Sequence, residues 1–379
     1  MSQPWDVAVV GLGAMGSATL WRAASRGLRA VGVDRFAPPH DRGSTHGGSR
    51  IIRTAYFEDP AYLPLLREAF PLWRELEHES GAALLTMTGA AMIGPRDSVL
   101  IRGSLRTAQM HDLPHSLVDG GDAARRFPQF VLGADDVVFH EEGGGILRPE
   151  ACVGAALDVA RRHGAEVRVD TRVDAVEPRG DGVRLHTDGV AVDARHAVVC
   201  AGAWTSRLLP SLPVPLRVER QVTAWFAPRD AALYAPERCP VFIRELPGGH
   251  FVYGIPAVDG DGVKLAVHHE GATADPDEAR HDADGDDLAP LREHAAQRMH
   301  GLDPEPLRAI TCLYTNTPDE HFVVDALPGA PQVTVVSACS GHGFKFAAVI
   351  GDIAVDLAAT GGTARPVEAF SLRRFAAPA

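Results

Sequence analysis

The sequence predicts an α/β protein made of two joined lobes, one built on a parallel sheet and the other on an antiparallel sheet. Three observations support this fold class. The chain opens with a strand, a glycine turn, a helix and a second strand, as parallel sheets often do. Further along, short apolar runs separated by turn residues indicate antiparallel strands. The length of 379 residues also exceeds what one hydrophobic core usually supports.

Composition argues against several classes of protein. The 49 acidic residues outnumber the 37 basic ones, and the resulting net charge of −12 argues against a nucleic-acid partner, which would require a basic face. No apolar run approaches the ~18 residues that a membrane span needs. The opening MSQPWDVAVVGLG has no basic segment, so we expect no signal peptide and a cytoplasmic protein. Five cysteines without CxxC spacing indicate a reducing compartment and no metal site.

The N-terminal unit carries the first binding motif. A strand over 6–10 leads into the turn Gly11-Leu12-Gly13-Ala14-Met15-Gly16, a helix over 17–26 follows, and a strand over 29–33 ends at Asp34. Glycines in this position let the backbone approach a pyrophosphate at the helix N-terminus. Asp34, 23 positions after Gly11, is placed to accept a hydrogen bond from a ribose hydroxyl. The motif predicts a dinucleotide and leaves NAD and FAD both open.

The rest of the chain favours FAD. We expect helices over 60–80, with a possible kink at Pro71, and over 149–163, then short strands over 166–169, 173–177, 183–187 and 190–193. A strand over 196–200 and an AG turn follow. Such a meander before a further strand suits an FAD-type Rossmann domain better than a plain NAD domain.

The later segments predict the second lobe and a return to the first. Residues 215–234 and 250–269 read as strands of the antiparallel lobe, and the acidic stretch 275–287 reads as a solvated loop. A strand over 333–338, a glycine loop over 340–345 and a helix over 346–358 close the chain. We therefore predict a discontinuous FAD-binding domain (1–80, 143–214 and 320–379) and an inserted antiparallel-sheet substrate domain (81–142 and 215–319).

Four further segments carry residues suited to chemistry. They are STHGGSRIIR (44–53), the alternating Lys264, Ala266 and His268 that follow Tyr253-Gly254, TCLYTNTPDEHF (311–322) and SGHGFK (340–345). Each of them alone has an ordinary structural explanation, such as a basic turn, a solvated strand or a small buried cysteine. One fact is sharper: Lys264 and Lys345 are the two lysines among the 37 basic residues. A compact ammonium persists where arginine is otherwise used, which indicates positions that a guanidinium cannot fill.

Taken together, these motifs resemble the monomeric sarcosine oxidases and N-methyltryptophan oxidases, FAD enzymes of the glycine/D-amino-acid oxidase superfamily. The resemblance runs nearly end to end and is carried by GLGAMG with Asp34, HGGSRIIR, the spacing of Tyr253, Lys264 and His268, CLYTNTPDEHFVVD and SGHGFKF. It implies FAD bound covalently, with the sulfur of Cys312 joined to the flavin 8α carbon.

The resemblance also implies roles for single residues. Arg53 and Lys345 match a pair that binds the substrate carboxylate, and Lys264 matches a lysine near flavin N5 where oxygen is reduced. Tyr253, Tyr314 and His268 match the substrate pocket, while Arg50 and His46 match residues at the flavin. The residues expected to bind the cofactor are Gly11, Gly13, Ala14, Met15, Gly16, Asp34, Arg35, Ser44, His46, Ser49, Arg50, Val173, Gly202, Cys312, Gly341, Gly343, Phe344 and Lys345.

The expected activity is oxidation of the C–N bond of a secondary, N-methyl α-amino acid such as sarcosine. Oxygen would be reduced to hydrogen peroxide, and formaldehyde and the primary amino acid would be released. No single residue stands out as the base that deprotonates the amine. Alternatives are an oxidase of a cyclic imino acid (pipecolate or proline type), a tailoring amine oxidase, a quinone-linked dehydrogenase, an NAD enzyme and a non-enzymatic flavin-binding protein. We expect a monomer that acts on a small molecule and oxygen.

Overall fold

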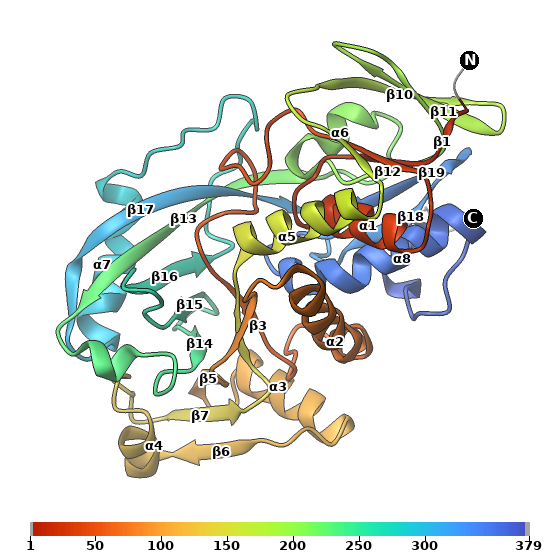
Figure 1. Cartoon of the computed structure of the whole chain (residues 1–379). Helices are drawn as coiled ribbons and strands as arrows, with labels where there is room; N and C mark the ends of the chain where they lie inside the picture. The colour runs from red at the N-terminus through yellow and green to blue at the C-terminus, as the bar shows by residue number, and fades with distance from the viewer. Residues whose placement is uncertain (1–2, 376–379) are drawn as a thin grey trace.

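Two large β-sheets organise the computed structural model, which describes residues 3–375. The long strands β13 (Arg217–Pro228) and β17 (Leu302–Asn316) pair along their whole length. They run across the molecule toward the glycine turn at residues 11–16 (Figure 1). None of the helices in the described part of the chain is both long and apolar enough to cross a membrane.

The first sheet combines a parallel centre with antiparallel edges. Its order is β10-β11-β12-β1-β2-β9, and β19 pairs with the second half of β12 while β18 pairs with β19. The members are β1 (Trp5–Val10), β2 (Ala30–Val33), β9 (Glu166–Arg168), β10 (Val173–Arg179), β11 (Gly182–Thr187), β12 (Val192–Val199), β18 (Val323–Leu327) and β19 (Ala330–Ser337). The parallel strands β1, β2 and β19 are buried over nearly their whole length, as expected of a sheet covered on both faces.

Three helices cover one face of this sheet and contribute to one apolar core. They are α1 (Ala14–Ser25), α5 (Pro149–Arg162) and α8 (Ala347–Thr360). The sequence patterns predicted all three. Helix α2 (Leu63–Ser80) packs on them, follows a 3₁₀ turn over Pro60–Tyr62 and continues through Pro71.

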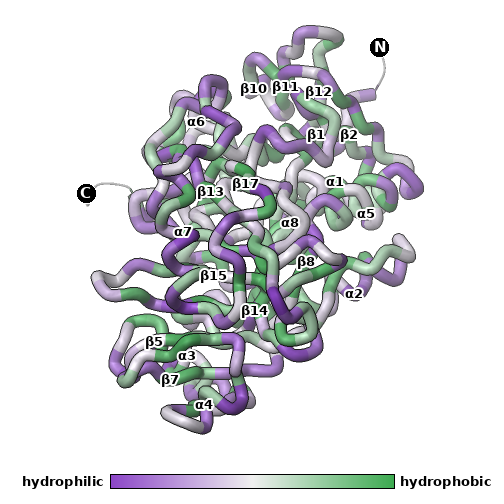
Figure 2. Tube along the Cα trace, turned by 90° about the vertical axis from the view of Figure 1, so that its left-hand side faces the viewer, coloured by the Kyte–Doolittle hydropathy of each residue, from purple (hydrophilic) through white to green (hydrophobic). Residues whose placement is uncertain are grey.

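The second sheet is mostly antiparallel, in the order β17-β13-β16-β15-β14-β5-β7-β6. Its other strands are β5 (Ala90–Pro95), β6 (Ser116–Asp119), β7 (Asp136–Glu141), β14 (Val241–Glu245), β15 (Phe251–Ile255) and β16 (Val263–His268). A three-stranded sheet of β3 (Arg50–Ile52), β8 (Gly145–Leu147) and β4 (Leu85–Met87) lies apart from these two. Helices α3 (Val99–Met110), α4 (Gly120–Arg126), α6 (Thr205–Leu208) and α7 (Gly285–Arg298) complete the fold. Figure 2 shows hydrophobic residues along β5 and β7 and hydrophilic ones along the outer loops.

The discontinuous division into domains stays a proposal. Each of the two large sheets draws its strands from one of the two expected domains, whereas the three-stranded sheet pairs β4 of the substrate range with β8 of the FAD-binding range. The proposed ranges include residues 1–2 and 376–379, which lie outside the described residues.

Three expectations about local structure were wrong in part. The strands expected over 190–193 and 196–200 are one strand, β12, whose first half alternates between buried and exposed residues and whose second half is fully buried. That change of burial, where the neighbour changes from β11 to β19, made one strand look like two. Segment 215–234 ends as a strand at Pro228 and finishes in a 3₁₀ turn. The acidic stretch 275–287 is partly tied down, and its last residues begin α7, where Asp284 caps the helix.

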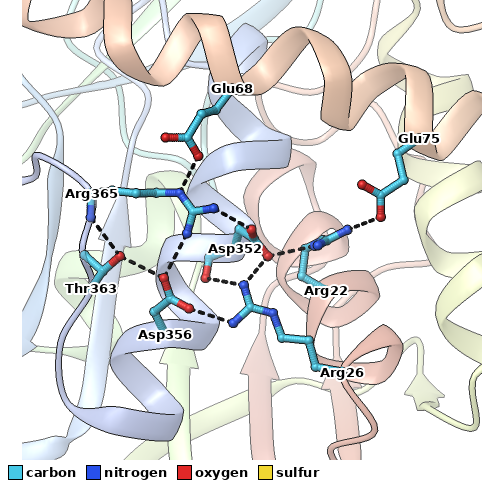
Figure 3. A network of polar contacts seen from close by, with 8 residues as sticks. All are labelled: Arg22, Arg26, Glu68, Glu75, Asp352, Asp356, Thr363 and Arg365. Carbon is cyan, nitrogen blue, oxygen red and sulfur yellow. Dashed lines mark hydrogen bonds and ion pairs between the residues drawn. The ribbon is translucent and has the colours of Figure 1, made fainter.

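A network of ion pairs fastens α1, α2 and α8 to one another (Figure 3). Asp352 on α8 is buried and accepts hydrogen bonds from Arg22, Arg26 and Arg365. Arg22 also pairs with Glu75 on α2 at 2.5 Å, and the network includes Glu68, Asp356 and Thr363. Asp352 alone of these charged groups is buried, and its burial is tolerable because three partly exposed arginines donate to it.

Candidate active site

A cavity of about 410 Å³ runs along the carboxyl ends of the parallel strands and reaches the second sheet. The turns that follow β1, β2, β12 and β19 line it on one side, and Ile243, Tyr253, Cys312 and Tyr314 line it on the other. Ligands of open α/β sheets bind at this edge, because the turns there present backbone N–H groups and helix N-termini.

The end of the cavity beside β1 and β2 is built for a nucleotide. Gly11 has φ +84°, and a Cβ there would lie 2.6 Å from the Cys200 carbonyl oxygen, so this position requires glycine. Helix α1 has no side-chain cap at Gly13. Its first N–H, of Ala14, donates to Thr45 Oγ1 at 3.3 Å, and Gly13, Ala14 and Met15 line the cavity, so the N-terminus of the helix is presented to an anion there. Asp34 lines the cavity and accepts from Leu12 N at 2.6 Å.

An acidic residue in the connection between β16 and α7 also lies at this end of the cavity. Asp277 lines the cavity and accepts hydrogen bonds from Arg35 Nη1 at 2.6 Å and from Trp204 Nε1 at 2.8 Å. It also pairs with Arg207. The segment expected to be a solvated loop therefore contacts the nucleotide end of the cavity. Its acidic composition gave no sign of these arginine partners.

The loop 44–50 forms the middle of the cavity wall and rests on β17. Arg50 donates to Ser44 O at 2.7 Å and to Ser49 O at 2.8 Å, and the Ser44 hydroxyl donates to Leu313 O. Ser44 and Arg50 line the cavity. Lys264 is 1% exposed and donates to the carbonyls of Gly47 and Ser49 at 3.0 and 2.9 Å.

Burial and positive neighbours shift the pKa values of two groups at this loop. Burial, reinforced by Arg50, holds the pKa of Lys264 well below its usual value. Burial, again followed by Arg50, lowers the pKa of His46 to about 4, so this imidazole is neutral at neutral pH.

Cys312 and Tyr314 alternate on β17, so both side chains point into the cavity from the same face of the strand. Cys312 is buried, with 6% of its surface exposed. Burial raises the pKa of its thiol, and the charges of Arg50 and Lys264 act in the opposite direction. Tyr314 lies with its hydroxyl 3.4 Å from His268 Nδ1, and burial holds the pKa of His268 well below its usual value.

The other end of the cavity holds two buried cations. Arg53 is 2% exposed and donates to both carboxylate oxygens of Glu58 at 2.6 Å. Lys345 Nζ donates to His342 O at 2.6 Å. Burial, and then the charge of Arg53, lowers the pKa of Lys345 to about 7. Both cations lie near the ring of Tyr56, at 4.3 and 5.2 Å from its centroid.

The cavity brings together nearly all the residues that the sequence singled out. Among the described residues, four of them lie outside its lining: Gly16, which packs against the Gly11 carbonyl, and His46, Ser49 and Lys264. Sequence reasoning missed Glu58 and Asp277, which line the cavity, and Glu150, which contacts the loop 44–50. A carboxylate in a loop or at a helix N-terminus has no pattern that marks it as part of a site.

Comparison with known proteins identifies the family. Residues 6–357 match the family model described as FAD dependent oxidoreductase. The chain belongs to this family. Over its full length it is 43% identical to a monomeric sarcosine oxidase of Streptomyces avermitilis, with 99% of that protein covered. It is 32% identical to the N-methyl-L-tryptophan oxidase of Salmonella dublin, with 98% of the chain and 99% of that protein covered.

Solved structures agree with this assignment. NikD, described as an unusual amino acid oxidase essential for nikkomycin biosynthesis, superimposes with a TM-score of 0.86 and 26% identity, and 98% of each chain is covered. The predicted α/β fold and the predicted membership of the sarcosine and N-methyltryptophan oxidase group are confirmed. The protein is an FAD-dependent oxidoreductase, and the NAD alternative is wrong.

The residues of the cavity fit FAD. The uncapped N-terminus of α1 is suited to the pyrophosphate and Asp34 to a ribose. The cavity is long enough to extend from these groups to Cys312, Tyr314 and Lys345 on its far walls. Arg50 and the Cys312 thiol, which both line the cavity, are the groups that would hold the isoalloxazine.

Proposed function

We propose that this oxidoreductase oxidises the C–N bond of a secondary, N-methyl α-amino acid, with oxygen as the electron acceptor. Hydrogen peroxide, formaldehyde and the primary amino acid would be the products. The observation that carries the proposal is the pair of buried cations, Arg53 and Lys345, at the end of the cavity beyond Cys312. The names of the relatives with 43% and 32% identity support the substrate class.

The chain's own residues would bind and orient the substrate. Arg53 offers a planar fork and Lys345 a point charge to one carboxylate, and in a buried site such charge-assisted hydrogen bonds are strong. The neutral His268 and the phenols of Tyr253 and Tyr314 would enclose the amine end. Fixing the carboxylate in this way places the N-methyl group at one position, which is catalysis by positioning.

FAD, when bound, supplies the two-electron oxidation itself. We propose that Cys312 holds it through a bond between its sulfur and the flavin 8α carbon. Arg50 and Lys264, on the loop side, would place positive charge where electrons accumulate. Lys264 would stabilise the anion that forms when oxygen accepts an electron, because a fixed cation in a dry site needs little reorganisation.

Anaerobic mixing of the purified protein with a panel of N-methyl amino acids tests the proposal. We expect sarcosine or a larger N-methyl amino acid to bleach the flavin absorbance within seconds and, once water hydrolyses the imine product, to release formaldehyde. Subsequent aeration should yield an equal amount of peroxide. N-methylamines without a carboxylate serve as controls and should leave the colour unchanged. A panel in which no amino acid bleaches the flavin would disprove the substrate class.

A cyclic imino acid is the second candidate, because it presents the same pair of groups to the cavity, a carboxylate and a secondary amine. The same cations would hold its carboxylate, and its ring carbon would be oxidised in place of a methyl group. Product analysis separates the two, because oxidation of a ring releases no formaldehyde.

We also infer a monomer, because the relative with 43% identity is named a monomeric enzyme. Size-exclusion chromatography with light scattering at several concentrations should give a mass near 40.4 kDa.

A further inference from the structure

Glu150, in the first turn of α5, has its carboxylate on the backbone of the loop 44–50. Its oxygen Oε1 accepts from Gly47 N at 2.6 Å and from Gly48 N at 3.0 Å, and Oε2 lies 3.2 Å from Gly48 N. Gly47 and Gly48 have φ values of +91° and +75°. Two successive N–H groups can converge on one carboxylate in this conformation, which glycine adopts readily.

Lys264 binds the same loop through the opposite groups of its backbone. Its ammonium donates to Gly47 O at 3.0 Å and to Ser49 O at 2.9 Å. The backbone of Gly47 therefore donates its N–H to an anion and accepts at its carbonyl from a cation. The peptide group that joins Gly47 to Gly48 makes both kinds of contact, through the Gly47 carbonyl and the Gly48 N–H. The two contacts polarise it in the same sense, so each strengthens the other. Two of the three ammonium hydrogens are used, which fixes the direction of the third.

The charges around Lys264 make this carboxylate important. Arg50 on β3 and Arg308 on β17 both oppose a positive charge at Lys264, while the Trp225 ring of β13 faces the ammonium at 5.1 Å. The Cys312 thiol of β17 is also nearby, and His46 of the loop is neutral. Among these groups, the Glu150 carboxylate favours the charged form of Lys264.

We propose that Glu150 is a positioning residue for Lys264: acting through the peptide groups of Gly47–Ser49, its carboxylate holds the ammonium in place and keeps it charged. That the charge serves oxygen reduction rests on the proposed function, whereas the coupling between the two residues does not. Glu150 does not line the cavity.

The scarcity of lysine makes the coupling directly measurable. Protein grown with lysine labelled with ¹³C at the ε carbon should give two side-chain signals, from Lys264 and Lys345. We expect Glu150→Gln to lower the titration midpoint of Lys264 by about one pH unit, the shift produced by losing ~1.4 kcal/mol of favourable interaction. The Lys345 midpoint should stay within about 0.2 units, the scatter expected of an unlinked site.

Two further variants make the result decisive. Glu77→Gln is the matched control, because Glu77 also accepts two backbone N–H groups, from Leu84 and Leu85 at 2.8 and 2.9 Å, away from the cavity. It should leave both lysine midpoints unchanged. Glu150→Asp keeps the negative charge, so the titration midpoint of Lys264 in this variant should lie close to the wild-type value. A folded Glu150→Gln protein with the wild-type midpoint at Lys264 would overturn the proposal.

Reoxidation kinetics give a second readout that does not need an amino acid. The holoenzyme is reduced chemically with dithionite and mixed with oxygen over a range of pH. Glu150→Gln should slow reoxidation about tenfold near neutral pH. The pH above which the reoxidation rate falls should also be lower in this variant, by the same amount as the Lys264 midpoint. Equal slowing at every pH would indicate a loosened loop and contradict the electrostatic role. Failure of the substrate proposal would show separately, as wild-type flavin that no amino acid bleaches.

Discussion

Arg53 gives one guanidinium nitrogen to both carboxylate oxygens of Glu58, at 2.6 Å each, inside the cavity where we place the substrate carboxylate. Glu58 therefore already pairs with one of the two cations that are proposed to bind the substrate. Arg53 is buried, so an unpaired charge there would be costly, and Glu58 compensates for it. A bound amino acid must share or displace this contact. The apparent affinity for substrate consequently includes competition with a carboxylate of the protein itself.

The first prediction concerns this competition. Glu58→Gln should tighten the binding of a carboxylate inhibitor about tenfold, since roughly 1.4 kcal/mol of the Arg53–Glu58 contact no longer opposes it. The ligand-free variant should also melt at a lower temperature, because Arg53 loses its counterion. Titration of the flavin absorbance measures the affinity. Weaker binding in the variant would instead assign Glu58 to holding Arg53 in its productive orientation.

The second prediction is a pH dependence set by Lys345, whose pKa burial and Arg53 lower to about 7. Below that pH the ammonium is charged and attracts a carboxylate; above it the charge is lost. Inhibitor binding should weaken as pH rises through about 7. The Lys345→Met variant should bind the inhibitor weakly, and its affinity should not change with pH in that range. Arg53→Ala should instead weaken binding at every pH, because a guanidinium does not titrate there. A flat profile in the wild type would refute this role for Lys345.

The third prediction separates the two half-reactions. Lys264→Met keeps the length of the side chain and removes the charge. Reoxidation of the reduced flavin by oxygen should slow by about 100-fold or more, as when one preorganised electrostatic group is removed. Reduction by substrate should change by less than about fivefold, because the carboxylate clamp is intact. Stopped-flow absorbance measures both, and comparable losses in the two steps would remove the assignment to oxygen.

The fourth prediction concerns Cys312. Acid precipitation of the wild-type protein should leave the yellow colour in the pellet, and mass spectrometry should show the added mass of FAD. Cys312→Ser should release its colour into the supernatant, because a serine hydroxyl does not form the thioether. Cys339→Ser, at another cysteine lining the cavity, is the control and should keep its colour in the pellet. Colour in the supernatant of the wild-type protein would exclude the covalent bond.

The fifth prediction tests the network of Figure 3. Burial alone would raise the pKa of Asp352, but the hydrogen bonds and charges of Arg22 and Arg26 outweigh burial and lower it. Its contribution to stability is therefore present above the unfolded pKa near 4 and is lost as pH falls through the lower folded pKa. Asp352→Asn should reduce the free energy of unfolding at pH 7 by about 3 kcal/mol. Glu305→Gln, which breaks the exposed pair with Arg292, should change it by less than about 0.5 kcal/mol. Denaturant titration measures both, and similar losses in the two variants would contradict the argument.

Local signals were enough for much of the fold and for most of the site's members. The glycine turn after β1, the acid at the end of β2 and the helices α1, α2, α5 and α8 all lie where sequence patterns predicted them, within a few residues. Much of the second lobe escaped prediction, including β5, β6 and β7, because these strands are short and β5 pairs with β14, which lies far away in sequence. The division of β12 into two expected strands failed for the same reason, since its burial depends on which strand lies beside it.

The sequence by itself determined the family, the cofactor class and the residue types of the site, because motifs such as GLGAMG and SGHGFK encode local backbone shape and a few side chains at fixed spacing. Only the tertiary structure decided which charges meet. Arg53 faces Glu58, Asp277 reaches Arg35 across the cavity, and Glu150 and Lys264 hold opposite groups of one loop. These pairs are up to 242 residues apart in the chain. Electrostatic energy depends on distance in space and on burial, and neither quantity can be read from the order of residues.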